Sequence, residues 1–361
     1  MNPLQRGRGA GPPTATGVAR RGSAMARLLG LAPVPVPPHV FAIEAGAIRY
    51  GGFARSGGGF DLERLAEVEL PPDTFHAGPL GGPLRGREAF DHALEAVLAE
   101  TSPAPTEASL VLPDRWLRLL FAPLEDELGA NPGDDILRFK LKKLVPFRVE
   151  DLRLRATVVP AVAGPSGTGA RLLFAFALEQ VLRDLEAVFE ARGVRIGQVA
   201  SRSLYLMSLL RHRAGTVAAE PPGDPDADLL LVNLEPDGYC LCYLAGGAPF
   251  VVRYRALQVD PGDPGQAAHV AQDLRILLGF LEEHLPGRFG GEVLVCGAPA
   301  AATTWVELLR DRFSLAARPL GAADLPGAGA IAGVSGPPSG STGAAWHRLA
   351  PLLAAAALEV A

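Results

Sequence analysis

A chain of 361 residues is long enough for two domains, each with a hydrophobic core of its own. Its hydrophobic content of 48% and charged content of 20% are typical of a folded globular protein and exclude a mainly disordered chain. The net charge of −5 gives no sign of the basic face that a nucleic acid requires, so no nucleic-acid partner is expected.

The cysteines and the apolar runs bear on the compartment. Cys240, Cys242 and Cys296 are too few and odd in number for a disulfide framework, which favours a reducing compartment. No apolar run approaches the ~20 residues that a membrane-spanning helix requires. The arginine-rich N-terminus lacks the apolar segment and cleavage site of a signal peptide. The sequence therefore predicts a cytoplasmic protein.

Residues 1–38 are rich in Arg, Pro and Gly and show no apolar periodicity, which predicts a disordered leader. Order is expected to begin with a short buried strand at 40–43, which turns into a hairpin partner at 47–50. Residues 62–70 fit a strand or a helix. An apolar stripe then predicts a helix at 88–100.

A compact α/β segment is predicted next. Its helix, 134–144, follows a Gly-Asp-Asp cap and carries its cations toward the C-terminal end, where the helix dipole favours them. Pro146 ends this helix region. The other elements expected here are strands at 109–112, 116–121, 152–159 and 171–178 and helices at 181–192 and 201–211, before a Pro/Asp-rich linker at 220–228.

The second half repeats the opening pattern. A strongly apolar strand is followed by the turn Pro236-Asp237-Gly238 and a returning strand. Because each half begins with such a hairpin, we expect a duplicated α/β domain with a cleft between the halves. The elements expected are strands at 228–234, 239–244, 249–257 and 292–296, helices at 266–285 and 302–313, and a final apolar helix.

The order and spacing of these elements resemble the PilM family. The resemblance is carried by residues 111–121, the helix at 136–143 and its exit Val145-Pro146-Phe147, and by the unit that runs from 172 to 196. It covers roughly residues 39–315 and implies an α/β, actin-like ATPase fold of the duplicated ribonuclease H-like type, with an inserted small α/β subdomain. It divides the chain into a leader at 1–38, a first actin-like subdomain at 39–89 and 196–227, the inserted subdomain at 90–195, and a second actin-like subdomain with the C-terminal helix at 228–361.

The resemblance also implies two phosphate-binding hairpins and a Gly-rich adenosine motif. The first hairpin falls on Glu44 and Gly46, with Glu44 where the family has Asp. The second falls on Asn233, which replaces an Asp, and on Glu235, which replaces a Gly and places a carboxylate where a phosphate would lie. The adenosine motif keeps only Gly297. We therefore expect a degenerate nucleotide site and no required cofactor, although Glu44 and Gly46 can still hold Mg²⁺ and ATP.

Other patterns give no catalytic or metal site. Gly164–Gly169 mimics a P-loop, but no lysine follows and the segment joins two strands, so a hairpin loop is expected. The seven histidines lack metal-ligand spacing, and no serine lies in a Gly-x-Ser-x-Gly elbow.

The family resemblance implies a scaffold of the inner-membrane assembly complex of a type IV pilus or type II secretion machine. It binds the N-terminal cytoplasmic tail of a PilN-like bitopic membrane protein, and other pilus subunits and self-association are further possible contacts. The protein would then lie in the cytoplasm, peripheral to the inner membrane, with membrane contact only through that partner. The implied groove places Arg138, Lys142, Pro146, Phe147 and Arg148 beside the tail, although these cations equally fit a solvated helix face.

Two other functions are compatible with the sequence. The first is an ATP-dependent phosphotransferase or ATPase of the actin/sugar-kinase superfamily, for which Asp237 is the acid best placed to act as a base. The second is an FtsA-like divisome protein. The C-terminal region is apolar and poor in cations, unlike the amphipathic anchor of that family, which counts against it.

Overall fold

The computed structural model describes residues 37–357, except for positions 45, 57–58, 76–79, 81–83, 102, 125–132, 163–168, 215–227, 258–261, 288–290 and 326–345. The expected leader, apart from Pro37 and Pro38, therefore lies outside the described residues, as do the P-loop-like segment up to Thr168 and the expected linker up to Pro225-Asp226-Ala227. Within the described part of the chain, no helix is long and apolar enough to cross a membrane.

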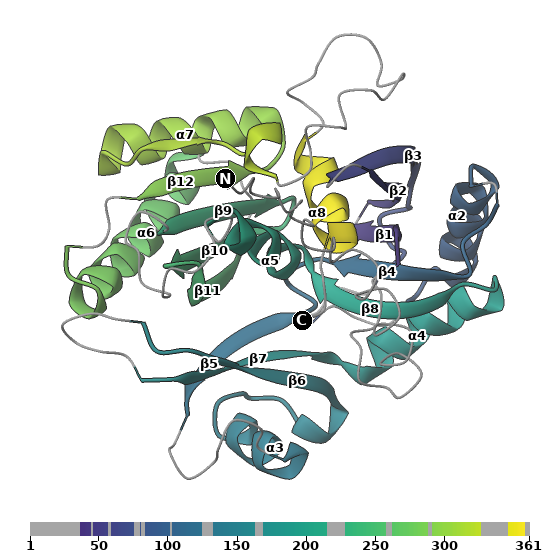
Figure 1. Cartoon of the computed structure of the whole chain (residues 1–361), viewed down its shortest axis with the longest axis horizontal. Coiled ribbons are helices and arrows are strands. Elements are labelled where there is room, and N and C mark those ends of the chain that lie inside the picture. Colours follow the sequence, from purple (N-terminus) through teal and green to yellow (C-terminus); the bar gives the residue numbers. More distant parts are fainter. Residues whose placement is uncertain are drawn as a thin grey trace, which may run out of the picture. The chain divides into compact units, whose positions relative to one another are not determined.

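The first half is built on a five-stranded sheet in the order β3-β2-β1-β4-β8 (Figure 1). The hairpin strands β1 (His39–Glu44), β2 (Ala47–Ser56) and β3 (Gly59–Glu69) pair antiparallel, whereas β4 (Glu107–Leu112) and β8 (Arg195–Ser201) run parallel to β1. The ambiguous segment at 62–70 is thus a strand, and β8 had not been predicted.

Side chains of the first sheet alternate between two cores, as the two-residue period of a strand requires. Phe41 and Ile43 pack under helices α2 (Arg87–Ala99) and α4 (Glu179–Ala191). Val40 and Ala42 point to the other face, toward the second half. Both faces of this sheet are therefore buried, which explains the continuous apolar runs of its central strands.

The second half repeats this topology strand for strand. Its sheet has the order β11-β10-β9-β12-β13, again with an antiparallel hairpin followed by two parallel strands. The duplication predicted from the sequence is thereby confirmed. The elements are β9 (Leu229–Glu235), β10 (Gly238–Ala245), β11 (Ala248–Ala256), β12 (Glu292–Cys296), β13 (Ala317–Pro319), and the covering helices α6 (Pro264–His284) and α7 (Pro299–Phe313).

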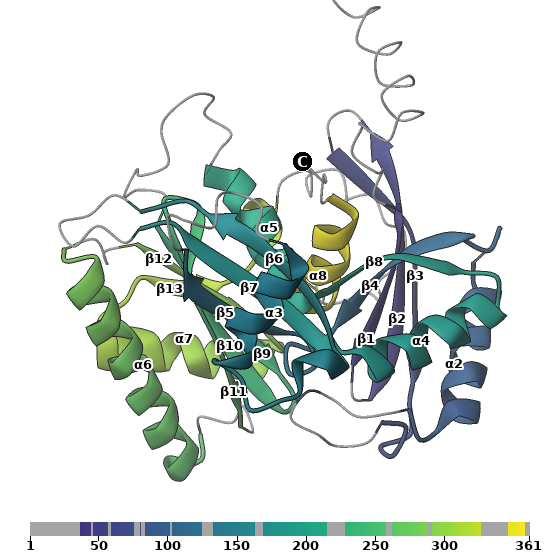
Figure 2. The same ribbon diagram turned by 90° about the horizontal axis from the view of Figure 1, so that it is seen from below.

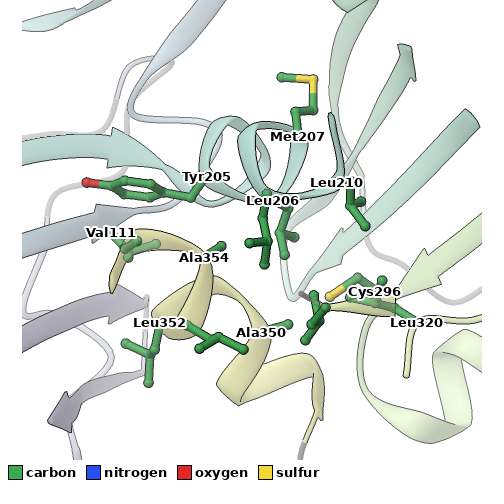
Figure 3. Packing of buried hydrophobic residues seen from close by; sticks show 14 of the residues in the cluster. Val111, Tyr205, Leu206, Met207, Leu210, Cys296, Leu320, Ala350, Leu352 and Ala354 are labelled. Atoms are coloured by element: carbon green, nitrogen blue, oxygen red, sulfur yellow. The ribbon is translucent and has the colours of Figure 1, made fainter. Parts of the chain in front are cut away.

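Helices α5 (Arg202–Ala214) and α8 (Trp346–Ala357) lie between the two sheets and share one hydrophobic core with both. Every residue of α8 from Leu349 to Ala356 is buried. Figure 3 shows Leu206 of α5 lying over α8 near Ala350 and Ala354, where small side chains allow close approach. The C-terminal helix, expected to belong with the second half, therefore packs on the first sheet as well.

The inserted unit is smaller than expected. Its sheet has the order β5-β7-β6, from β5 (Arg118–Pro123), β6 (Leu152–Val159) and β7 (Arg171–Leu178). Helix α3 (Asp134–Lys142) and a short 3-10 turn, Val149–Asp151, complete a separate core. The expected boundaries of 90–195 need correction, because β4, α2 and α4 belong to the first sheet and its helical layer.

The insert leaves the chain within the first half but docks on the second. The guanidinium of Arg171 on β7 lies 4.5 Å from the ring centres of both Phe121 and Phe250. It also donates to the backbone carbonyls of Phe250, at 2.9 Å, and Pro249, at 3.2 Å. Burial lowers the pKa of Arg171. A stacked, hydrogen-bonded arginine of this kind fixes the insert against β11.

Candidate functional site

The carboxyl ends of β1, β4 and β9 meet at the junction of the two halves, where open α/β sheets commonly bind ligands. A cavity of ≈ 160 Å³ lies there. Phe75, Trp116 and Pro351 contribute apolar walls, and Glu44 and Glu235 line it from opposite halves. The structure thus brings Glu44 and Glu235, predicted from separate hairpins, to one site.

Asp114, directly after β4, is the centre of a buried polar network. Its carboxylate accepts hydrogen bonds from the backbone N–H of Ser203 at 2.9 Å, from the Ser203 hydroxyl at 2.5 Å and from Nδ2 of Asn233 at 2.9 Å. Asp114, Ser203 and Asn233 are each 3% exposed or less. Asn233, where the family has an Asp, is therefore engaged within the protein. Its Oδ1 atom is buried and has no hydrogen-bond partner.

Glu235 closes the same network from the second half. Both of its carboxylate oxygens accept from the backbone N–H of Asp114, at 3.0 and 3.2 Å. Burial, with Asp114 adding to it, raises the pKa of Glu235 well above its usual value. The carboxyl group of Glu235 therefore occupies the space beside the Asp114 amide at the junction of the halves.

Arg202, the first residue of α5, holds Glu44. The guanidinium lies 3.4 Å from the Glu44 carboxylate, and Arg49 forms a second ion pair with it. Burial opposes the charged form of Arg202, but Cys296, Glu44 and Glu235 more than offset this, so its pKa is raised. Glu44 is therefore neutralised by two arginines, which reduces its attraction for a divalent cation.

The two glycines predicted for nucleotide binding differ in role. A Cβ added at Gly46 would meet no atom within 4 Å, so this turn needs no glycine for space. A Cβ at Gly297 would lie 2.7 Å from the Cβ and Cδ1 atoms of Leu234. The glycine at 297 is thus required for packing of β9 under the start of α7. The position that a Cβ of residue 297 would take is bordered by Leu234, a side chain of the protein core.

Taken together, these contacts engage the residues predicted for nucleotide binding within the protein itself. The Asp114 amide is used by Glu235, Glu44 is paired with arginines, and Gly297 is covered by Leu234. Asp237, the acid considered as a general base, forms an ion pair with Arg115 across the junction. Among the described residues, no cluster of three or more His, Cys, Asp or Glu side chains is arranged to hold a metal ion.

The predicted partner residues lie together on the insert, but not all of them are available. Arg138 donates to Asp134 at 2.8 Å and to the backbone carbonyl of Val149 at 2.7 Å, so it supports its own subdomain. Phe147 is half-buried against the insert core. Lys142, Pro146 and Arg148 are exposed, and Arg148 pairs with Asp151 at 3.7 Å.

Asp114, Ser203 and Arg202 were not predicted as site residues. Asp114 lies between the strands expected at 109–112 and 116–121, and Arg202 and Ser203 lie in the helix expected at 201–211, with no role predicted for these side chains. A usable signal was present: Asp114 is an acid that follows a largely buried strand and a proline, at the edge where ligands bind. Its partners lie 89 and 119 positions away, so local spacing gave no indication of the network.

No protein-family model and no curated protein matches this chain. A chain of the PilM-PilN type IV pilus biogenesis complex superposes on it with a TM-score of 0.64 and 16% identity, covering 89% of this chain and 98% of that one. The chain has the actin-like fold of the PilM type. The fold predicted from the resemblance is therefore confirmed.

Two further solved structures match this chain with lower TM-scores. A Bacteroides thetaiotaomicron protein with an actin-like ATPase fold and unknown function has a TM-score of 0.45 and 10% identity, over 79% of this chain and 91% of that one. The cytoplasmic domain of EpsL, an inner-membrane component of the Vibrio cholerae type II secretion system, has a TM-score of 0.40 and 11% identity, over 72% and 81%.

Proposed function

We propose that this chain is a scaffold of a type IV pilus or type II secretion inner-membrane assembly complex. On this proposal it lies at the cytoplasmic face of the membrane and binds the N-terminal tail of a PilN-like bitopic protein. The observation that carries the proposal is the position of Glu235, which stands where the family resemblance implies a phosphate-binding glycine and which accepts from the Asp114 amide. The PilM-type fold supports the choice of machine.

The polar network supports a role that does not depend on nucleotide. A Mg-nucleotide normally bridges the two halves of an actin-like fold, and here Asp114 of the first half bonds directly to Asn233 and Glu235 of the second. The protein therefore holds its own halves together. A rigid body of this kind is suited to presenting a fixed binding surface, because a preorganised site loses less entropy on binding.

The insert offers the surface for the tail. Pro146 fixes the direction of the chain after α3, and Phe147 provides apolar area that is only partly used by the insert core. An extended peptide laid beside such a segment gains main-chain hydrogen bonds as well as apolar contact. Lys142 and Arg148 lie exposed next to it and can contact polar groups of the tail.

The second candidate is an ATP-dependent phosphotransferase or ATPase. One observation favours it: the ≈ 160 Å³ cavity lies between the halves and is lined by Glu44, Arg115 and Asp237, which are charged groups of the kind such chemistry uses. It would require the Arg115–Asp237 ion pair to separate before Asp237 accepted a proton.

Thermal unfolding with two ligands separates the candidates. One ligand is a synthetic peptide with the N-terminal cytoplasmic sequence of a PilN-like single-pass membrane protein from the same organism, and the other is Mg-ATP. A scaffold is stabilised by the peptide, because ligand stabilisation rises with the ratio of concentration to Kd, and not by the nucleotide. Stabilisation by Mg-ATP with release of phosphate would instead support the phosphotransferase or ATPase.

A further inference from the structure

Helix α3 of the insert and the residue that follows it carry every lysine of the chain. Lys140, Lys142 and Lys143 lie within four residues at its C-terminal end, and the other cationic side chains of the protein are arginines or histidines. The same short stretch exposes large apolar side chains. Phe139 is 60% exposed, Leu144 47% and Ile136 42%.

These side chains share one face of the helix. Successive residues of an α-helix are rotated by about 100°, which places Ile136, Phe139 and Lys143 opposite Leu141. Leu141 is buried in the insert core. Lys140 and Leu144 continue this arc along one side. We call the set Ile136, Phe139, Lys140, Lys143 and Leu144 the outer face of α3.

The outer face contains no carboxylate. The acids of the helix, Asp134 and Asp135, are confined to its first turn. Asp134 is paired with Arg138 at 2.8 Å, on the side facing away from Phe139, and Asp135 lies one turn before Phe139, just outside the arc. The ammonium group of Lys143 lies 4.4 Å from the centre of the Phe139 ring, so cation and aromatic surface are interleaved.

Such a surface is unusual for this protein. In the described part of the chain, six large apolar side chains are exposed, and three of them belong to the outer face. Figure 1 shows α3 at the outer side of the insert sheet, away from the strands of the two main sheets, and Figure 2, seen from below, shows α3 in front of the insert strands. The outer face is therefore presented to the surroundings.

We propose that the outer face of α3 adsorbs to an anionic phospholipid surface. Bulky apolar side chains beside lysines on one helix face match the composition of interfacial helices, whose apolar groups enter the headgroup region while the ammonium groups pair with lipid phosphates. The positive charge of Lys140 and Lys143 complements anionic lipids, whereas the whole chain carries a net charge of −5.

The inference goes beyond the scaffold proposed above but does not depend on it. A tail held beside Pro146 starts from the bilayer, so the neighbouring outer face would lie near the headgroups. Adsorption by the chain alone requires no tail. The lipid experiment therefore contains no peptide and the peptide experiment contains no lipid, so that each proposal fails or succeeds separately.

The test is co-sedimentation of the full chain with vesicles. We expect binding to vesicles of phosphatidylglycerol and phosphatidylethanolamine, little binding to phosphatidylcholine alone, and weaker binding in high salt, which screens the lysines. Lys140→Glu/Lys143→Glu should lower the partition coefficient at least about tenfold. Ile136→Ser/Phe139→Ser should lower the partition coefficient by a similar factor. Because this variant keeps both lysines, its binding should depend on salt as that of the wild type does.

Matched controls come from α6 of the second half. Ile276 is 45% exposed, close to the 42% of Ile136, and Arg275 lies beside it on an exposed position. Ile276→Ser and Arg275→Glu should leave vesicle binding unchanged. Melting temperatures of all variants should stay near that of the wild type, because the altered side chains are exposed or half-exposed.

A second measurement follows the aromatic side chain itself. The wild type has three tryptophans of its own, and anionic vesicles that contain brominated lipid should quench little of their emission. In the Phe139→Trp variant the same vesicles should quench the additional emission of the new tryptophan. Three results would overturn the proposal: no binding to anionic vesicles at about 5 mM lipid, well above the range of weak single anchors; equal binding by the outer-face and α6 variants; or a Phe139→Trp variant that still binds while its added emission stays unquenched.

Discussion

The backbone N–H of Asp114 donates to both carboxylate oxygens of Glu235, at 3.0 and 3.2 Å. Asp114 follows β4 and Glu235 ends β9, so each lies at the end of a central strand in its own half. Their bond therefore joins the two halves directly. Since the same Asp114 also accepts from Ser203 and Asn233, its removal should affect both halves at once.

Replacement of Asp114 by Asn should destabilise the protein. The amide would turn one donor toward the Ser203 and Asn233 donors, and leaving buried groups unpaired costs about 2–3 kcal/mol. The same substitution at Asp263, which caps α6 by accepting from the Gly265 amide at 2.9 Å, serves as the control. Asn caps a helix about as well as Asp, so the change there should stay within about 0.5 kcal/mol. Equal effects of both substitutions in chemical unfolding would contradict the network.

Glu235 should make stability depend on pH. Its pKa is raised above the usual 4.5, so the folded state keeps a proton that the unfolded state has lost. This contribution is fully present below pH 4.5 and is lost as pH rises through the folded pKa. The unfolding free energy of the wild type should therefore fall, relative to Glu235→Gln, as pH rises from about 5 to 9.

In the comparison with Glu235→Gln, the contributions of other titrating groups to the unfolding free energy cancel. Burial lowers the pKa of His347 to about 4, which affects stability in the opposite direction but equally in both proteins. Gln keeps an oxygen that can accept from the Asp114 amide. Parallel pH profiles for the two proteins would show that Glu235 ionises normally.

Gly297→Ala tests whether this glycine serves packing. The new Cβ would lie 2.7 Å from Leu234, and such overpacking costs about 1–3 kcal/mol. Leu234→Gly, which removes the Cβ as well as the rest of the side chain, should relieve the clash, so the double variant should be less destabilised than the sum of the single ones. Gly279→Ala on α6, where a Cβ meets nothing within 4 Å, should be neutral or stabilising. Additive effects of positions 234 and 297 would contradict the packing role.

Arg171→Lys should loosen the insert from the second half. Lysine cannot stack between Phe121 and Phe250 while donating to two carbonyls, and we expect a loss of about 1–2 kcal/mol with faster proteolysis of the insert. Arg155→Lys on the neighbouring strand β6, where the side chain is exposed, provides the control. Unchanged proteolysis of Arg171→Lys would show that the insert is held by other contacts.

The repeated hairpins were predictable because local patterns determine them. The duplication was predicted from two apolar runs, at 40–43 and 228–234, and from the turns that follow them. Strand β8 (Arg195–Ser201) was missed because its residues are mostly half-exposed or polar, and it pairs with a strand 88 positions earlier at Glu107 and Arg195. Its place depends on tertiary contacts that periodicity does not encode.

The candidate site was predictable only in part. Glu44, Asn233 and Glu235 were found through the family motif, and the structure brings Glu44 and Glu235 to one cavity. The sequence did not indicate that Asp114 would satisfy both Asn233 and Glu235, because that depends on how the halves meet. Likewise, the half-buried position of Phe147 follows from the insert core.

The affinity for the membrane partner's tail tests the central claim most directly. Isothermal titration should measure binding of the tail peptide to the wild type and to Lys142→Glu/Arg148→Glu, with Arg275→Glu as the control. Lys142 and Arg148 are exposed, so melting temperatures should not change. We predict that the peptide binds the wild type and the control equally without Mg-ATP, and the double variant about fivefold or more weakly. Failure of the peptide to bind the wild type, or equal binding by the double variant, would contradict the proposed scaffold and its site.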